Sequence, residues 1–143
     1  MPALHGTAGH RVLPHTADNI ISAWAPTRDR CIVEAVAGLV DSFADTAGAP
    51  ARRLHSFTVT AGSDEAVLVA VLDEVLFVLD ARGSVPISTS LAATHGNRID
   101  VTFTVTGTDD VEIIGSLPKG ISFSGLEFAH SKGNWHCAAT VDV

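Results

Sequence analysis

The last residues of the sequence carry two anionic groups that could bind a cation. Asp142 and the α-carboxylate of Val143 lie within two residues of each other, and two anions this close repel unless water or a cation separates them. Calcium takes about six to eight oxygen ligands from carboxylates, carbonyls and water. One more acidic residue from elsewhere in the chain would therefore complete a site for an oxygen-preferring cation. The alternative is a frayed and solvated terminus.

Asp18 is a candidate for that third acidic group. It follows the residues His15, Thr16 and Ala17. Of the seven histidines in the chain, which lack the spacing of metal ligands, we retain His15 as a possible supporting residue because it lies so close to Asp18. The alternative for Asp18 is a turn aspartate that hydrogen-bonds to its own backbone. Spacing alone does not choose between the two interpretations.

The sequence contains none of the familiar catalytic motifs. It has no nucleophile elbow, no HExxH zinc motif, no P-loop and no dinucleotide-binding glycine pattern after a strand. The cysteines Cys31 and Cys137 are far apart and neither belongs to a CxxC pair. We therefore expect two buried thiols of the kind found in a reducing cytosol, rather than a disulfide or a zinc site. An independent hydrolase is disfavoured because no nucleophile–base pair is visible.

Length and composition indicate a single folded domain with an acidic surface. The chain has 143 residues, of which 46% are hydrophobic and 17% charged, which is typical of a compact globular protein. Sixteen acidic against nine basic residues give a formal net charge of −7. This balance disfavours direct binding to nucleic-acid phosphates or to an anionic membrane surface. A protein partner, a cation or a small molecule remains compatible with it.

The chain shows no pattern of an export signal or a transmembrane helix. Residues 1–9 lack a basic region followed by an apolar run, and the most apolar stretch, 66–79, is interrupted by Asp73 and Glu74. We expect a cytoplasmic protein with a flexible N-terminus at 1–9 and one domain over 10–143.

The spacing of apolar residues predicts an α+β domain with two main helices and a mostly antiparallel sheet. The first helix carries an apolar stripe from Ile32 to Phe43 and should be stopped by Gly48 and Pro50. The second is expected to begin after an N-cap at Ser63 and to end at Arg82-Gly83. Patterns typical of strands occur at 10–13, 19–25, 54–60, 87–93, 98–106, 111–114, 121–129 and 134–143.

The sequence resembles the archease family, the small accessory proteins of the tRNA-splicing RNA ligase, in four short motifs that follow one another along the chain. The resemblance extends from about His10 to the end of the chain. The motifs are His15-Thr16-Ala17-Asp18 followed by Trp24, Leu72-Asp73-Glu74-Val75-Leu76-Phe77, Lys119-Gly120-Ile121-Ser122-Phe123-Ser124, and Val141-Asp142-Val143.

This resemblance implies a metal-dependent activator without a complete active site of its own. It implies that Asp18, Asp142 and the main chain or terminal carboxylate of Val143 hold calcium, and that Lys119 is needed for activation. Ser122, in the same motif as Lys119, is a possible supporting residue. The implied fold is an antiparallel sheet with two helices, in which one strand-helix-strand-strand unit is inserted into another.

The implied partner is an RNA ligase that uses GTP and manganese. A histidine of this ligase takes up GMP. Family members promote this guanylylation and allow the ligase to turn over repeatedly. Because the ligase must bind RNA, we expect its surface to be basic, and an acidic partner would gain from electrostatic steering.

At two of the places where the sequence departs from the family pattern, a polar group of that pattern is missing. Gly96-Asn97 stands where many family members have Gly-Glu, and Phe123 stands where a tyrosine is common. Two alternatives therefore remain for a divergent member that has lost ligase activation. One is a small-molecule or metal-binding module with a pocket lined by helix 64–80, and the other is a homo-oligomerising domain that uses the apolar surface of this helix.

Overall fold

The computed structural model describes residues 7–15, 18–93 and 98–143, and of Pro14, His15 and Ala93 only the backbone. Its helices are α1 (Arg28–Asp41) and α2 (Asp64–Arg82), with a short 3-10 helix η1 (Thr108–Asp110). Its strands are β1 (Gly9–His15), β2 (Asp18–Ala25), β3 (Ala44–Asp45), β4 (Arg53–Thr60), β5 (Ser84–Ala93), β6 (Arg98–Gly107), β7 (Glu112–Ile113), β8 (Gly120–Ser131) and β9 (Asn134–Asp142).

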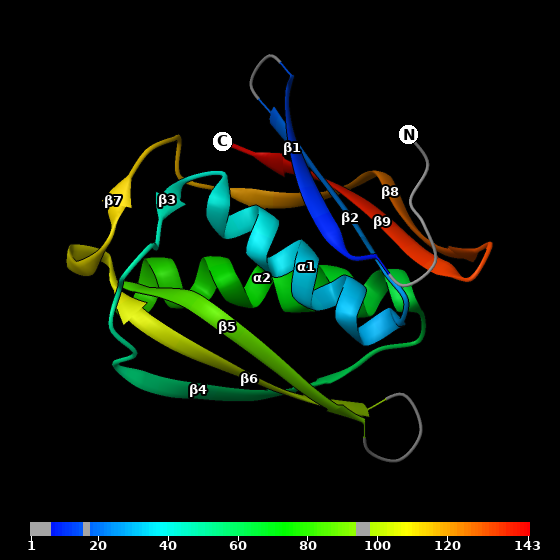
Figure 1. The fold of residues 1–143 in the computed structure, drawn as a ribbon, viewed down its shortest axis with the longest axis horizontal. Coiled ribbons are helices and arrows are strands. Elements are labelled where there is room, and N and C mark those ends of the chain that lie inside the picture. Colours follow the sequence, from blue (N-terminus) through cyan, green and yellow to red (C-terminus); the bar gives the residue numbers. More distant parts are fainter. Residues whose placement is uncertain (1–6, 16–17, 94–97) are drawn as a thin grey trace.

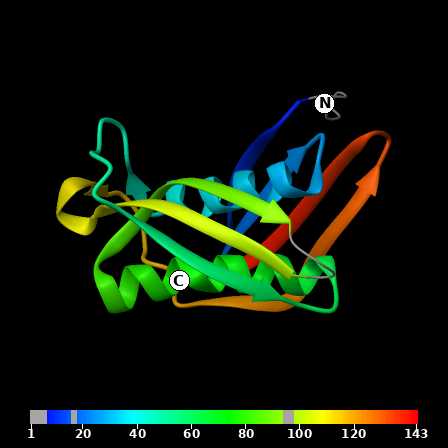
Figure 2. The same ribbon diagram turned by 90° about the horizontal axis from the view of Figure 1, so that it is seen from below.

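The two helices form a layer between two antiparallel sheets (Figures 1 and 2). The four-stranded sheet has the order β1-β2-β9-β8, the three-stranded sheet has the order β4-β6-β5, and β3 pairs with β7. Helix α1 contacts β1, β2 and β9 of the first sheet and β5 of the second, while α2 contacts β8 on one side and β4 and β5 on the other. The predicted α+β class with two helices and antiparallel strands is confirmed, and the strands divide between separate sheets.

Helix α2 is apolar around most of its circumference because sheets cover it on two sides. Its buried residues are Val67, Leu68, Val69, Val71, Leu72, Val75 and Val78. Both limits of the helix agree with the prediction. At its start, the Ser63 side chain accepts a hydrogen bond from the Ala66 backbone N–H at 3.1 Å. At its end, Gly83 has a φ of 57°, a left-handed conformation that glycine adopts without a Cβ clash. Within the described part of the chain, no helix is long and apolar enough to cross a membrane.

The end of α1 differs from the prediction. The helix stops at Asp41, well before Gly48, and the Ser42 hydroxyl donates a hydrogen bond to the Leu39 carbonyl at 2.6 Å. Phe43 is fully buried although it lies outside the helix, which is why it extends the apolar stripe in the sequence. The chain then forms β3, whose partner β7 is shorter than the strand expected at 111–114.

Strands β5 and β8 also extend beyond their predicted limits. Strand β5 begins at Ser84 rather than at 87, and its register shifts between Pro86 and Ser88, since proline has no N–H to donate to a ladder. Strand β8 runs to Ser131, beyond the predicted limit of 129, with an irregularity between Ser122 and Glu127. Residues 123–126, inside this irregularity, have no partner in the register of β8 with β9.

Candidate functional site

Asp18 and Asp142 lie directly opposite each other. Asp18 is the first residue of β2, Asp142 is the last residue of β9, and the two are partners in the register of this antiparallel pair. Side chains of directly opposed residues point to the same face of a sheet, with Cβ atoms roughly 5 Å apart. The sheet thus brings together two acidic residues from near the beginning and the end of the chain.

The charges of these two carboxylates are not offset by an ion pair within the described part of the chain. Asp18 is half-buried and Asp142 is exposed, and among the described residues no ion pair joins either of them to a basic group. Like charges directly opposed across two strands destabilise the pair. The arrangement therefore favours a positive charge from outside the chain at this position.

Gly120 leaves space beside the Asp142 carboxylate. It is the first residue of β8 and lies opposite Asp142 on the other side of β9. A Cβ atom built on Gly120 would lie 3.5 Å from Oδ2 of Asp142, so a longer side chain would crowd this oxygen. The neighbouring Lys119 backbone N–H donates a hydrogen bond to the Asp142 carbonyl oxygen at 2.7 Å, which fixes the start of β8 to the end of β9.

Val143 and His15 lie next to this acidic pair. The Val143 side chain is partly buried against the hydrophobic core, which keeps its main-chain oxygen close to Asp142. The backbone of His15 pairs with that of Asp18 across the β1–β2 hairpin, while its side chain, like Thr16 and Ala17 of the same motif, lies outside the described residues.

The donor chemistry of the acidic pair suits an oxygen-preferring cation. Over residues 7–15, 18–93 and 98–143, no cluster of three or more His, Cys, Asp and Glu side chains could hold a metal. Asp18 and Asp142 therefore supply two carboxylates, and further ligands have to be main-chain oxygens and water. Calcium accepts such mixed oxygen sets, whereas zinc prefers histidine and cysteine.

Ser122 lies on β8, and Lys119 lies directly before this strand. Lys119 is exposed, and its backbone bond to Asp142 makes it an immediate neighbour of the acidic pair. Ser122 pairs with Thr140 of β9, and its hydroxyl oxygen accepts a hydrogen bond from the Ser124 backbone N–H at 3.0 Å. Ser122 thus supports the β8 irregularity, in which the Phe123 side chain is 68% exposed. Asn97, the other departure from the family pattern, lies outside the described residues.

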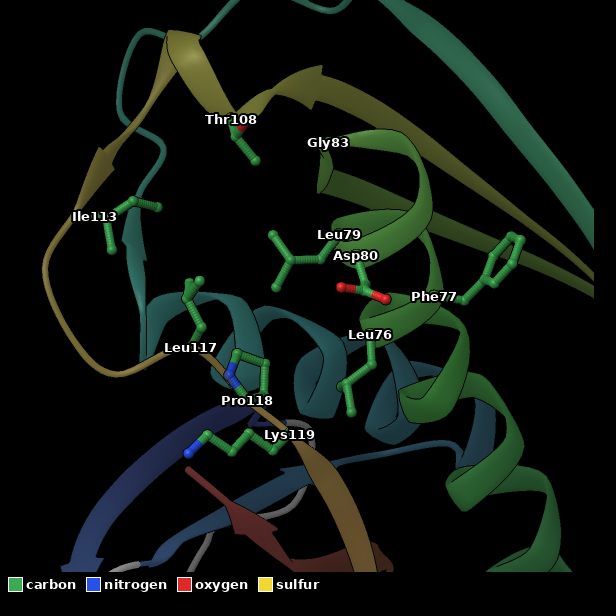
Figure 3. A pocket seen from close by; sticks show the side chains of 10 residues that line it. All are labelled: Leu76, Phe77, Leu79, Asp80, Gly83, Thr108, Ile113, Leu117, Pro118 and Lys119. Carbon is green, nitrogen blue, oxygen red and sulfur yellow. The ribbon is translucent and has the colours of Figure 1, made fainter.

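A cavity of about 770 Å³ lies beside Lys119 (Figure 3). It lies between the C-terminal part of α2 and the segment that connects β7 to β8, and we call it the α2 groove. Its lining residues are Leu76, Phe77, Leu79, Asp80, Gly83, Thr108, Ile113, Leu117, Pro118 and Lys119. The sequence predicted one wall of this groove, the apolar helix 64–80. The opposite wall was missed because its residues are far from α2 in the sequence and had been assigned to a strand and a turn.

The cysteines are buried and adjacent. Their Sγ atoms lie 3.6 Å apart, between α1 and β9. The hydrogen bond with Cys31, followed by burial, raises the pKa of the Cys137 thiol far above its usual range. Since the thiolate is the reactive form and the metal ligand, this pair is an inert part of the core.

Comparison with known proteins relates the chain to one family. Residues 10–143 match the Archease protein family (MTH1598/TM1083). The sequence is 44% identical over 137 residues to "Probable protein archease" from Mycobacterium tuberculosis, in both strain CDC 1551 / Oshkosh and strain H37Rv, covering 96% of this chain and 76% of those proteins.

Two solved structures have the same fold. The solution structure of Methanobacterium thermoautotrophicum protein 1598 superposes with a TM-score of 0.73 at 19% identity, covering 94% of this chain and 99% of that one. The crystal structure of an archease from Thermotoga maritima, described as a possible chaperone, gives a TM-score of 0.66 at 16% identity, covering 92% and 94%. At these identities the likeness concerns the fold alone.

Proposed function

Since this chain belongs to the archease family, we propose that it is a calcium-binding accessory protein that activates a GTP-dependent tRNA-splicing RNA ligase. The observation that carries this proposal is the juxtaposition of the Asp18–Asp142 pair with Lys119 at one end of the four-stranded sheet. The reaction itself belongs to the ligase, whose own histidine takes up GMP.

Each residue of the acidic end has a defined task in this proposal. Asp18 and Asp142 hold the cation with their carboxylates, and Val143 adds a main-chain oxygen. Calcium, when bound, would offset the two negative charges at this end of the sheet. Lys119 presents its ammonium group to the ligase, and its backbone bond to Asp142 fixes the main chain of Lys119 beside the acidic pair.

The charge of the whole chain also favours this partner. An enzyme that binds RNA presents basic surface, and a protein with a net charge of −7 is steered toward such a surface. Complementary charge mainly accelerates the encounter, and the contacts around Lys119 then determine what the complex does.

The direct test is a guanylylation assay with the ligase of the same organism. The ligase is incubated with labelled GTP and manganese, with and without this protein, and the covalent GMP adduct is quantified. We expect the protein to accelerate adduct formation at least tenfold. An adduct formed at the same rate with and without the wild-type protein would contradict the proposal.

Variants separate the two parts of the site. Asp18→Ala and Asp142→Ala should lose both calcium binding and stimulation, whereas the exposed Asp109→Ala, outside the site, should retain both. Lys119→Ala should lose stimulation but keep calcium binding. The matched control is Lys132→Asn, which removes the other lysine of the chain from a position at φ 54° that asparagine tolerates. Loss of folding in Lys119→Ala, detected by circular dichroism, would contradict a specific contribution of Lys119.

A further inference from the structure

We propose that the α2 groove is a docking site for the ligase, and that it accepts a surface segment with a large apolar side chain followed by a lysine or arginine. This inference rests on the proposed function and extends it from the acidic end to an adjacent surface. No property of the acidic pair requires the groove, so the two are tested separately.

The apolar residues of the groove are unusually exposed. Leu117 is 47% exposed and Ile113 is 46% exposed, and both belong to the segment opposite α2. Leu76 and Leu79 form the wall on the helix side. Exposed apolar surface gathered in one hollow is characteristic of interaction sites. The floor of the groove is therefore suited to bury one or two apolar side chains of a partner.

Asp80 gives the α2 side of the groove a negative charge. In Figure 3 its carboxylate projects from α2 toward the side of the cavity that Leu117 forms. Among the described residues no basic group pairs with it; the nearby Arg82 lies over the Phe77 ring, 5.7 Å from its centroid. Gly83, at the carbonyl end of α2, also lines the groove, and the helix dipole adds partial negative charge there. A lysine or arginine beside an apolar side chain complements this pattern.

The position of the groove favours the ligase over a small molecule or a second copy of the chain. Lys119 lines one edge of the groove, and its backbone N–H is bonded to Asp142. A protein that contacts Lys119 is therefore placed at the edge of the groove. The acidic charge of Asp80 matches a basic RNA-binding partner, whereas a second copy of this chain would bring a net charge of −7 against the same surface.

The test measures binding of the ligase to this protein in the presence of calcium. We expect Leu117→Asp and Ile113→Asp each to weaken the affinity at least tenfold, and Asp80→Lys to weaken it more than Asp80→Asn. The calcium-induced rise in melting temperature should stay unchanged in all four variants. The matched control is Leu54→Asp, which replaces a leucine that is 68% exposed on β4, outside the groove, and should bind like the wild type.

Each outcome decides between the proposals. Wild-type affinity in the folded Leu117→Asp and Ile113→Asp variants would overturn the groove inference alone, whether or not a small molecule binds there. A change of molecular mass in solution in these variants, with ligase binding unchanged, would assign the groove to self-association and overturn it as well. Failure of the wild-type protein to bind or stimulate the ligase would overturn both the proposed function and the docking site.

Discussion

At the scale of single residues, the opposed carboxylates of Asp18 and Asp142 work against stability when no cation is present. Cross-strand pairs contribute roughly 0.2 to 1 kcal/mol, and like charges directly opposed are unfavourable. The native state tolerates this cost because the rest of β2 and β9 remains paired. A bound cation would remove this cost.

The repulsion between the two carboxylates predicts that Asp142→Asn changes the stability in opposite directions with and without calcium. In a metal chelator, the variant should be more stable than the wild type by about 0.5 kcal/mol, because the repulsion with Asp18 is removed. In calcium it should be less stable than the wild type, because a ligand is lost. Chemical denaturation under both conditions checks the reversal. The same loss of stability in chelator and in calcium would contradict it, and Asp109→Asn serves as the control.

The sequence pointed to Asp18 and Asp142 as candidate ligands, but it could not predict how they are arranged. Asp142 was identified by its chemistry and Asp18 by the family motif around it. Their direct opposition depends on the register of β2 against β9, which periodicity does not determine. Gly120 has no side chain that would suggest a function, and its position beside the Asp142 carboxylate depends on the pairing of β8 with β9.

At the scale of elements, β1 is held to α1 by one histidine between two acids. Nδ1 of His10 lies 3.0 Å from Oε1 of Glu34, and Nε2 lies 2.7 Å from Oδ2 of Asp41. Burial acts to lower the pKa of His10, but the hydrogen bonds to Glu34 and Asp41 outweigh it and raise the pKa above its ordinary value of 6.5. The histidine thus keeps its proton more readily in the folded than in the unfolded protein.

The raised pKa of His10 makes this contact dependent on pH. Its contribution to stability is fully present below pH 6.5, the ordinary histidine value, and is lost as the pH rises through the higher pKa of the folded state. We expect His10→Gln to cost about 1 kcal/mol at pH 5.5 and much less at pH 9. Denaturant unfolding of both proteins at the two pH values measures the difference. A cost that does not fall with increasing pH would contradict the assignment.

Burial on two sides makes α2 sensitive to truncation of its core residues. Leu72 is fully buried, and Leu72→Ala should cost about 2 to 5 kcal/mol, which combines lost transfer free energy and a cavity. Phe77, on the same helix, is 45% exposed, and Phe77→Ala should cost clearly less. Urea denaturation of the two variants tests the ranking, and equal costs would contradict the sandwiched position of the helix.

The sequence predicted the long elements better than the short ones. Helix α2 has an N-cap, an apolar band and a glycine C-cap that agree with one another, so its limits were correct. Strand β3 was not predicted, because its two residues are too few for a period to show, and only the middle of the strand expected at 111–114 forms β7. Phe43 misled the prediction of α1 because a buried aromatic residue just after a helix looks like its last turn.

At the scale of the whole molecule, the three-layer arrangement explains how a small acidic protein can present two surfaces at one end. The helices fill the space between the sheets (Figure 1), so both the acidic end of the four-stranded sheet and the α2 groove remain on the outside. Lys119 belongs to both, since it lines the groove and adjoins Asp142. A partner that contacts Lys119 is therefore adjacent to both surfaces.

The measurement that tests the central claim most directly is thermal unfolding of the protein as calcium is added. At a calcium concentration of about 100 times the dissociation constant, binding adds about 2.7 kcal/mol of stability. We predict that the melting temperature of the wild type and of Asp109→Ala rises by several degrees, while that of Asp18→Ala and Asp142→Ala does not change. An unchanged melting temperature in the wild type, or an undiminished rise in both site variants, would contradict a cation held between these two aspartates.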